Sequence, residues 1–429
     1  MLSVVRKMTV VVLIVTLVIT MTPAAFAGTS LTDNEKQTIE TEPVQDDNVV
    51  KNEKTCKTAT VKATAKSSGS AAGYLASMIQ NGQPAEIDIS QYRVSADTSS
   101  VKRLYEDMLN SNPQLFYVGS TVGWTQTSSG YVKTIDPQYK MSRSKIAAAT
   151  KKFNSAVNDC IKTIAPGSND MQKALQVHDY LVLNAKYMKC SMQQTAYGVL
   201  VDKKGVCQSY ALAYEYIMNK LGIETTYIAS SSMNHIWNMS KINGRWYQID
   251  VTYDDPTSDK MGRVSHKYFM KSDSAMRSMG HSWNTKSYAC SSGKYNNAFW
   301  KKVKTGVFKQ GKYYYYVSPK GKLIRKTISS GRTKTIKLPQ SRWYVWGSHS
   351  TYWNWTPTIA KGKKGIYVNT ATGIYKVKGS KTKRVKKIRK SSKGYVYGIK
   401  IVKGKLTVAK SKNPNSHSAQ KLSKIKGTY

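Results

Sequence analysis

The sequence predicts an α+β protein, with a helix packed on an antiparallel sheet in its central part and an all-β domain at its C-terminal end. Residues 71–290 alternate helical patterns with strand-like runs, whereas residues 300–429 hold only short strand-like runs separated by Gly and Pro turns. The charge is segregated too. Of the net charge of +43, the segment from Ser274 to Tyr429 supplies 37 Lys and Arg and no Asp or Glu. A chain of 429 residues with such contrasts indicates several domains.

The N-terminus has the pattern of a secretory signal peptide. Two basic residues precede an apolar run from Met8 to Met21 that is too short to span a bilayer comfortably, and Ala25-Phe26-Ala27 is a small-x-small cleavage pattern. We expect residues 1–27 to be removed and the mature protein to be secreted, extracellular or wall-associated, without a later transmembrane segment. An uncleaved anchor is the minor alternative. The polar residues 28–70 are expected to form a disordered spacer.

Residues 71–165 are predicted to be an α+β region that precedes the main core. Apolar residues recur at helical spacing in three stretches and follow strand patterns in two others. Asn112-Pro113 ends the second helix, because the residue before a proline disfavours helical backbone. We expect helices near 72–80, 101–110 and 144–164, and strands near 115–118 and 131–139.

The catalytic domain is expected at 166–290, with a helix at 170–186, a strand near 223–229 and a hairpin. Asn243-Gly244 favours a two-residue type I′ turn, which needs positive φ at both positions. The turn joins strands 235–242 and 245–252. It pairs Ile242 with Arg245, Trp237 with Asp250 and His235 with Thr252. Since side chains alternate along a strand, His235 and Asp250 share one face as diagonal neighbours.

Cys207 stands at the start of a predicted helix. Apolar residues recur at helical spacing from Tyr210 to Leu221, and Gly222 suits the position after a helix end. Free N–H groups and the positive end of the helix dipole favour a thiolate there and can stabilise an oxyanion on a substrate carbonyl. Gly205 leaves room for a substrate backbone. Thiol, imidazole and carboxylate together supply a cysteine nucleophile with an oriented base.

The stretches around these residues resemble the transglutaminase-like superfamily over about residues 170–285, and more weakly over 70–165. The likeness rests on Gly205-Val206-Cys207-Gln208-Ser209-Tyr210, His235-Ile236-Trp237, Asp250-Val251-Thr252-Tyr253-Asp254-Asp255-Pro256, Tyr268-Phe269-Met270-Lys271-Ser272-Asp273 and His281-Ser282-Trp283. Ser209 is a departure, since many relatives have glycine there. The resemblance implies a papain/transglutaminase-like core, in which the helix with the cysteine packs on the sheet with the histidine and the aspartate.

The resemblance also implies roles for three residues. Cys207 is the nucleophile, His235 the general base and then acid, and Asp250 orients the imidazole. The implied reaction is acyl transfer on peptide or protein amides through a thioester, with water as acceptor in a protease or amidase and an amine in a transglutaminase. The substrate, the acceptor and the second oxyanion donor stay open, with Gln193 and Gln194 as options. The alternative is a non-catalytic wall-binding or scaffold protein that keeps the fold.

The other reactive side chains have plainer interpretations. With Cys207 free, Cys56, Cys160, Cys190 and Cys290 allow three disulfide connectivities, and the sequence weakly favours Cys160 with Cys190. No Cys-x-x-Cys pair or histidine cluster suggests zinc, and no cofactor is expected. We expect a packed or surface position for His178 and a turn at Asp254-Asp255-Pro256, where calcium ligation is the lesser alternative. His281 is expected to pack against the catalytic face, with the substrate groove as the lesser alternative, and Trp237 either walls the active site or belongs to the core.

Residues 300–429 are predicted to form a basic β-rich domain of hairpins or partial propeller blades, because strand-like runs recur about every 8–12 residues. Core packing is expected for Trp343, Trp346, Trp353 and Trp355, with a sugar-stacking platform as the lesser alternative. The dense run Lys381–Lys390 is compatible with a solvated loop. So basic a domain calls for anionic counterparts. In an exported protein these are first of all cell-wall polymers, and nucleic acid is a weaker option.

Overall fold

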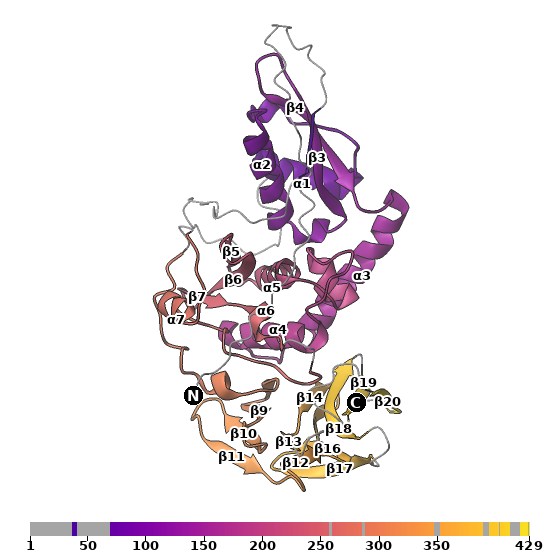
Figure 1. Cartoon of the computed structure of the whole chain (residues 1–429), viewed down its shortest axis with the longest axis vertical. Helices are drawn as coiled ribbons and strands as arrows, with labels where there is room; N and C mark the ends of the chain where they lie inside the picture. Colours follow the sequence, from indigo (N-terminus) through magenta and orange to yellow (C-terminus); the bar gives the residue numbers. More distant parts are fainter. Residues whose placement is uncertain are drawn as a thin grey trace.

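The computed structural model describes residues 37–40, 69–256, 260–284, 288–346, 352–388, 394–402, 404–411, 421–427 and 429. The expected signal peptide at 1–27, most of the expected spacer at 28–70 and Cys56 lie outside the described residues. Figure 1 shows an elongated molecule in which the N-terminal region, the central core and the C-terminal sheets follow one another along the long axis.

The N-terminal region sets helices against a four-stranded sheet of order β1-β3-β4-β2. Its elements are β1 (Gln37–Glu40), α1 (Ala71–Gly82), β2 (Ile87–Asp88), η1 (Ser90–Tyr92), α2 (Thr98–Ser111), η2 (Pro113–Leu115), β3 (Val118–Gln126), β4 (Val132–Tyr139) and α3 (Arg143–Ile161). The expected strand near 115–118 is wrong, because Pro113 opens a 3₁₀ turn that holds Leu115. Strand β1 falls inside the range expected to be a disordered spacer and pairs with β3.

The central core packs helix α5 on the antiparallel sheet β5-β6-β7. Its elements are α4 (Asp170–Asn184), η3 (Gly198–Asp202), α5 (Cys207–Lys220), β5 (Thr225–Ser230), β6 (His235–Ile242), β7 (Arg245–Ile249), α6 (Val251–Asp254) and α7 (Asp273–Ser278). Nearly every side chain of α5 is buried, so the helix that begins at Cys207 is enclosed by the core on most sides and is held firmly in place.

The β6-β7 hairpin has the register that the sequence predicts. Asn243 and Gly244 both have positive φ, at 50° and 77°, and Ile242 pairs with Arg245. The expected strand end is wrong, however. Strand β7 stops at Ile249, and Asp250 caps the short helix α6 by accepting a 2.9 Å hydrogen bond from the N–H of Tyr253. Asp250 is therefore the point where the strand turns into a helix.

The C-terminal part is built of antiparallel strands, as expected. The sheets are β11-β10-β9-β8, β12-β13, β14-β15-β16-β17 and β18-β19-β20. Their elements are η4 (Phe299–Lys302), β8 (Phe308–Gln310), β9 (Tyr313–Val317), β10 (Leu323–Thr327), β11 (Thr333–Ile336), β12 (Trp343–Trp346), β13 (Tyr352–Trp355), β14 (Ile359–Gly362), β15 (Gly365–Asn369), β16 (Gly373–Lys378), β17 (Lys381–Lys387), β18 (Tyr395–Val402), β19 (Lys405–Ser411) and β20 (Lys421–Ile425).

Two features of these sheets bear on the expectations from the sequence: the tryptophans of the β12-β13 hairpin and the basic run Lys381–Lys390. Trp343 faces Trp355 across the β12-β13 hairpin, and both are buried, which agrees with core packing. The basic run that suits a solvated loop instead contains the edge strand β17, paired with β16. Its basic side chains are exposed, and an edge strand rich in lysine resists pairing with another chain.

One hydrophobic core joins the three parts of the molecule. It runs from Trp124 of β3 and Phe153 of α3, through Tyr214 of α5, to Val307 and to Tyr316 of β9. The first strands of the basic region thus complete the core of the central part, as the contact between the orange and magenta elements in Figure 1 suggests.

A buried ionic network reinforces this junction. Nδ1 and Nε2 of His178 lie 2.9 Å and 3.2 Å from carboxylate oxygens of Asp179 and Asp254, and Nε2 of His266 lies 2.8 Å from Asp179. The backbone N–H of Val307 donates to the second oxygen of Asp179 at 2.7 Å. Burial alone lowers the pKa of His178, but its bonds to the two carboxylates raise it to about 9.

The cysteines do not pair as expected. All four described cysteines are free thiols, so the proposed bridge between Cys160 and Cys190 is wrong. Cys160 is fully buried near the end of α3, where burial raises its pKa beyond the usual range. Cys190 is partly exposed, with its Sγ 3.5 Å from the carbonyl oxygen of Lys204.

Candidate active site

Cys207 is the first residue of α5. No side chain caps this helix end, and its first hydrogen-bonded backbone amide is that of Tyr210, which donates to the carbonyl of Val206. The N–H groups of Cys207, Gln208 and Ser209 accordingly have no backbone partner among the described residues. Uncapped amides at a helix start are suited to an anionic sulfur or to the oxyanion of an acyl intermediate.

His235 and Asp250 meet just beyond the end of the hairpin ladder. The ladder stops at the pair Asn238–Ile249, so the expected pairs of Trp237 with Asp250 and of His235 with Thr252 do not form. Nε2 of His235 lies 2.7 Å from Oδ2 of Asp250, and the Asp250 side chain is fully buried. Burial lowers the pKa of His235, but the charge of Asp250 and hydrogen bonds to Asp250 and Cys207 raise it to about 10. Burial likewise opposes the charge of Asp250, but the facing imidazoles hold its pKa below the usual range.

The structure thus brings together the three residues singled out in the sequence. Because Nε2 of His235 is bonded to Asp250, the other ring nitrogen is left to exchange a proton with the Cys207 thiol. The imidazole is sandwiched between two aromatic rings, with centroids 4.6 Å from Tyr253 and 5.6 Å from Trp237. Trp237 is buried, and its indole N–H donates to Gln248. These contacts fix the ring plane and restrict water around it.

A second histidine binds the same carboxylate oxygen. Nε2 of His281 lies 2.8 Å from Oδ2 of Asp250, the side chain is buried, and its Nδ1 has no hydrogen-bond partner among the described residues. Asp250 therefore accepts from His235, His281 and the amide of Tyr253. The sequence predicts that His281 packs against the catalytic face, with the substrate groove as the lesser alternative. Nothing in its spacing shows that a residue 31 positions after Asp250 bonds to the Asp250 carboxylate.

Replacing His281 by phenylalanine is expected to slow acylation of Cys207 by p-nitrophenyl acetate. The variant loses one charge-assisted hydrogen bond to Asp250, a contribution of about 1.5–3 kcal/mol, or roughly tenfold to hundredfold in rate. His281→Gln can still present an N–H at the position of Nε2 and should recover most of the rate. If both variants fold and acylate at the wild-type rate, His281 does not position Asp250.

Gly205, before α5, and Ser209, in its first turn, have packing roles. Oγ of Ser209 donates to the carbonyl of Thr195 and accepts from the N–H of Val199, so the departure from glycine is accommodated in a buried turn. A Cβ at Gly205 would meet the Ser209 side chain at 2.4 Å. Gly205 is therefore required by contact with Ser209, and this differs from the expectation that it makes room for substrate.

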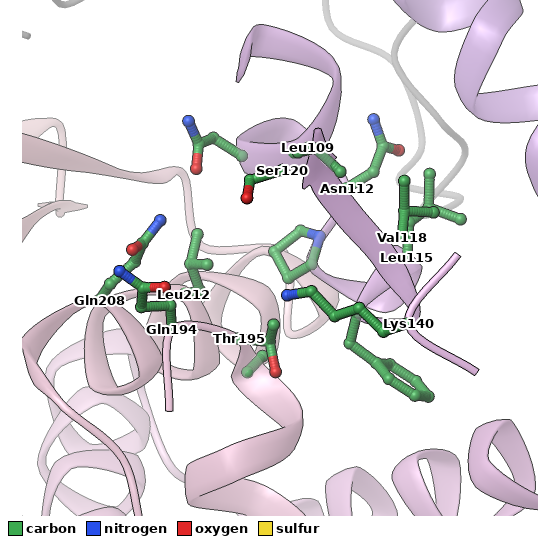
Figure 2. Close-up of a pocket in the computed structure, with 14 residues that line it drawn as sticks. Leu109, Asn112, Leu115, Val118, Ser120, Lys140, Gln194, Thr195, Gln208 and Leu212 are labelled. Carbon is green, nitrogen blue, oxygen red and sulfur yellow. The ribbon is translucent and has the colours of Figure 1, made fainter. Parts of the chain in front are cut away.

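A pocket lies between the N-terminal region and α5. Its walls include Leu115 of η2, Val118 of β3 and Leu212 of α5, and Figure 2 shows Lys140 pointing in from one side with Gln194 and Gln208 at the other. None of Cys207, His235 and Asp250 lines it. Of the two glutamines weighed as oxyanion donors, Gln193 accepts from the amide of Cys190, whereas Gln194 faces this pocket.

Two groups of side chains could in principle hold a metal ion: His178, Asp179 and His266, and His235, Asp250 and His281. The fold assembles both from residues far apart in sequence. In each group one carboxylate oxygen accepts from two imidazoles at 2.7–2.9 Å. These are ordinary hydrogen-bond lengths, so each carboxylate holds its two imidazoles through hydrogen bonds.

A comparison with protein families places the same residues in one domain. Residues 159–251 match the model of the transglutaminase-like superfamily. The matched range contains Cys207, His235 and Asp250, and it covers the helices α4 and α5 and the sheet β5-β6-β7. None of the curated proteins matches the sequence.

Three solved structures are similar to part of this chain. They are a candidate protease from Parabacteroides distasonis ATCC 8503 (13% identity, TM-score 0.19), a TGase (12% identity, TM-score 0.21) and a candidate cysteine protease from Cytophaga hutchinsonii (20% identity, TM-score 0.20). The alignments cover 30%, 38% and 28% of this chain and 33%, 49% and 52% of the respective structures. The chain thus spans from a third to about half of these proteins, and the assignment of the core rests on the family match.

Proposed function

We propose, from the premise that residues 159–251 form a transglutaminase-like core, that the protein is a cysteine acyl-transfer enzyme that acts on peptide or protein amides. The observation that carries the proposal is the convergence of Cys207, at an uncapped helix start, with a buried His235–Asp250 pair 2.7 Å apart. Family membership supports cysteine protease or transglutaminase-type chemistry in general. The assignment of the three residues comes from their geometry.

The proposed reaction has two halves. The Cys207 thiol passes its proton to His235, and the sulfur attacks the substrate carbonyl carbon. The oxyanion that forms is stabilised by the free amides at the start of α5. The C–N bond then breaks, His235 returns the proton to the leaving amine, and a thioester remains. Water or a second amine attacks the thioester, His235 takes the proton of that nucleophile, and the thiolate leaves.

Alkylation by iodoacetamide tests the nucleophile against a reference in the same chain. Cys190 is partly exposed, with its Sγ against the carbonyl oxygen of Lys204, whereas Cys160 and Cys290 are buried. We expect Cys207 to be alkylated at least about tenfold faster than Cys190, as measured by peptide mass spectrometry, because an imidazole beside the sulfur favours the thiolate. Equal rates for the two cysteines would favour the non-catalytic alternative, in which the fold serves as a wall-binding or scaffold module.

The nature of the acceptor calls for a product assay. The protein is incubated with a glutamine-containing peptide in the presence and absence of a primary amine. Backbone cleavage, deamidation and amine incorporation each change the mass of the peptide by a different amount. One assay therefore separates a protease, a deamidase and a transglutaminase, which share the same acylation half.

We also propose that the protein is exported and retained at the cell wall by its basic C-terminal region. The signal-peptide pattern at 1–27 and the 37 basic residues after Asp273 support this. Among the described residues, no helix has the length and apolar character needed to cross a membrane. Attraction between dispersed lysines and an anionic polymer needs no dedicated pocket, and it weakens as salt screens the charges.

Neutralising strand β17 is expected to weaken binding to isolated cell walls. The five exposed basic residues Lys381, Lys383, Arg384, Lys386 and Lys387 are replaced by glutamine, which should lower retention at least about tenfold at low salt and less at 0.5 M salt. The measurement is sedimentation of the full-length protein with the walls.

A matched variant controls for the loss of charge in general. It replaces five exposed lysines outside the basic region by glutamine: Lys145, Lys151, Lys152, Lys162 and Lys220. Its retention should stay near that of the wild type. Equal loss in both variants, or in neither, would show that the basic region has no special part in retention.

A further inference from the structure

The surface around Cys207 is unusually apolar. Seven large apolar side chains are exposed among the described residues, and three of them, Tyr187 (51%), Met188 (46%) and Tyr253 (45%), lie at the candidate active site. Scattered apolar residues on a surface need no explanation, but a group of them beside a functional side chain points to binding.

Contacts place these residues beside the nucleophile. Tyr187 forms a parallel bridge with Gly205, two residues before Cys207, and the N–H of Met188 donates to the carbonyl of Gly205 at 3.0 Å. The ring of Tyr253, on helix α6, stacks on the imidazole of His235. Burial raises the pKa of the Tyr187 and Tyr253 hydroxyls, and the nearby Cys207 and Asp250 raise both further.

The segment around Tyr187 also has an open backbone edge. The bridge to Gly205 uses the carbonyl of Lys186 and the amide of Met188. In an extended chain the amide and carbonyl of the residue between them point to the opposite side. Neither group of Tyr187 has a hydrogen-bond partner in the part of the chain that the structure describes. An open strand edge of this kind accepts a further strand.

We propose that the substrate binds as an extended peptide segment that pairs with the backbone of Tyr187 and places an apolar or aromatic side chain against the rings of Tyr187 and Tyr253. This inference rests on the proposed function and specifies its substrate class: a locally unfolded or flexible segment of a peptide or protein. The segment lies on the side of Tyr187 that faces away from Gly205. Contact of its apolar side chain with Tyr253, whose ring stacks on His235, keeps the segment at the catalytic pair.

The experiment uses peptide probes that react with a thiol. Acetylated tripeptide chloromethyl ketones carry phenylalanine at one of three positions and serine at the other two, and an all-serine probe is the reference. The second-order rate of Cys207 alkylation is measured on the full chain. We expect phenylalanine at one position to raise the rate at least about tenfold over the reference, the effect of burying an aromatic side chain.

Variants test whether Tyr187 causes the faster reaction of the phenylalanine probe. Tyr187→Ala should reduce the ratio of the phenylalanine probe to the serine probe below about threefold, and Tyr187→Phe should keep it. Tyr288→Ala is the matched control, because Tyr288 is a similarly exposed tyrosine (42%) that stacks on Trp246 of β7; its ratio should stay at the wild-type value. Because both rates are measured on the same variant, a general change in the reactivity of the Cys207 thiol alters both equally and leaves their ratio unchanged.

N-methylation of the probe tests the backbone pairing. A methyl group on one amide should slow alkylation at least about tenfold at one position and little at the others, because it removes a single hydrogen-bond donor. Equal rates for all probes, or a preference that survives Tyr187→Ala, would overturn the inference. If Cys207 also fails to exceed Cys190 with iodoacetamide, the proposed function itself has failed. Fast iodoacetamide labelling with equal probe rates rejects the substrate inference alone.

Discussion

Cys207→Ala is expected to abolish acyl transfer and to leave the fold intact. The change removes only Sγ from a partly exposed side chain, while Gln208 and the following residues of α5 keep their buried contacts. Loss of the nucleophile in an enzyme with a covalent intermediate costs on the order of 10⁵–10⁶-fold in turnover. Turnover of the glutamine peptide and trapping of a thioester by mass spectrometry measure the effect, and thermal unfolding checks the fold.

The matched control is Cys190→Ala, which removes the other partly exposed thiol among the described residues. We expect it to retain wild-type turnover and to form the thioester on Cys207. Turnover near the wild-type level in Cys207→Ala would refute the assignment of the nucleophile, even if iodoacetamide alkylates Cys207 faster than Cys190.

Asp250→Asn is expected to move the alkaline limit of activity toward neutral pH and to lower turnover. Asp250 is the main reason that the pKa of His235 is raised to about 10, against the effect of burial. In the wild type His235 stays protonated as pH rises until about 10. Without the charge its pKa falls toward the ordinary value of 6.5 or below, so at pH 8 the imidazole is neutral and no longer pairs with a thiolate.

The expected loss of turnover near pH 8 is about 10²–10⁴-fold, the usual contribution of a positioned acid–base group. A pH–rate profile measures both effects. Asp255→Asn is a suitable control, because the carboxylate of Asp255 accepts a hydrogen bond from the hydroxyl of Tyr210. The alkaline limit of this variant should stay near pH 10. An unchanged limit in Asp250→Asn would show that another group sets the protonation of His235.

The raised pKa of His235 also makes the stability of the folded protein depend on pH. A histidine whose pKa is raised on folding stabilises the native state below its unfolded pKa of about 6.5. That stabilisation is lost as pH rises through the folded pKa of about 10. The wild type should therefore unfold at lower temperature above about pH 10. Asp250→Asn should lose the part of this dependence that His235 causes and keep the part from His178, whose pKa is raised to about 9.

Local features of the site could be predicted from the sequence because local chemistry decides them. Asn243-Gly244 fixes a type I′ turn, and the turn fixes which residues of β6 and β7 face each other. The apolar spacing from Tyr210 onward and Gly222 locate α5 and place Cys207 at its first turn. One register and one helix start suffice to bring Cys207, His235 and Asp250 together.

Features that depend on distant segments could not be predicted. His281 reaches Asp250 across a loop, and Asp179 meets His266 and Val307 from 87 and 128 residues away. No periodic pattern encodes such contacts. The pairing of Cys160 with Cys190 failed for the same reason, since nearness to one domain says nothing about whether two thiols face each other. The lysine-rich composition of Lys381–Lys390 is compatible with a solvated loop, but Lys381–Lys387 form strand β17. Pairing with β16 outweighs the low preference of lysine for strands.

The bond from Val307 to Asp179 sets an order of events during synthesis. As the chain emerges, α4 is complete long before Val307 appears, 128 residues later, to close over its buried carboxylate. Until then the aspartate and its histidine neighbours must stay in water, because an unpaired charge is costly to bury. Contacts so far apart in sequence form slowly, so the network of His178, Asp179 and His266 closes only after nearly three quarters of the polypeptide has been made.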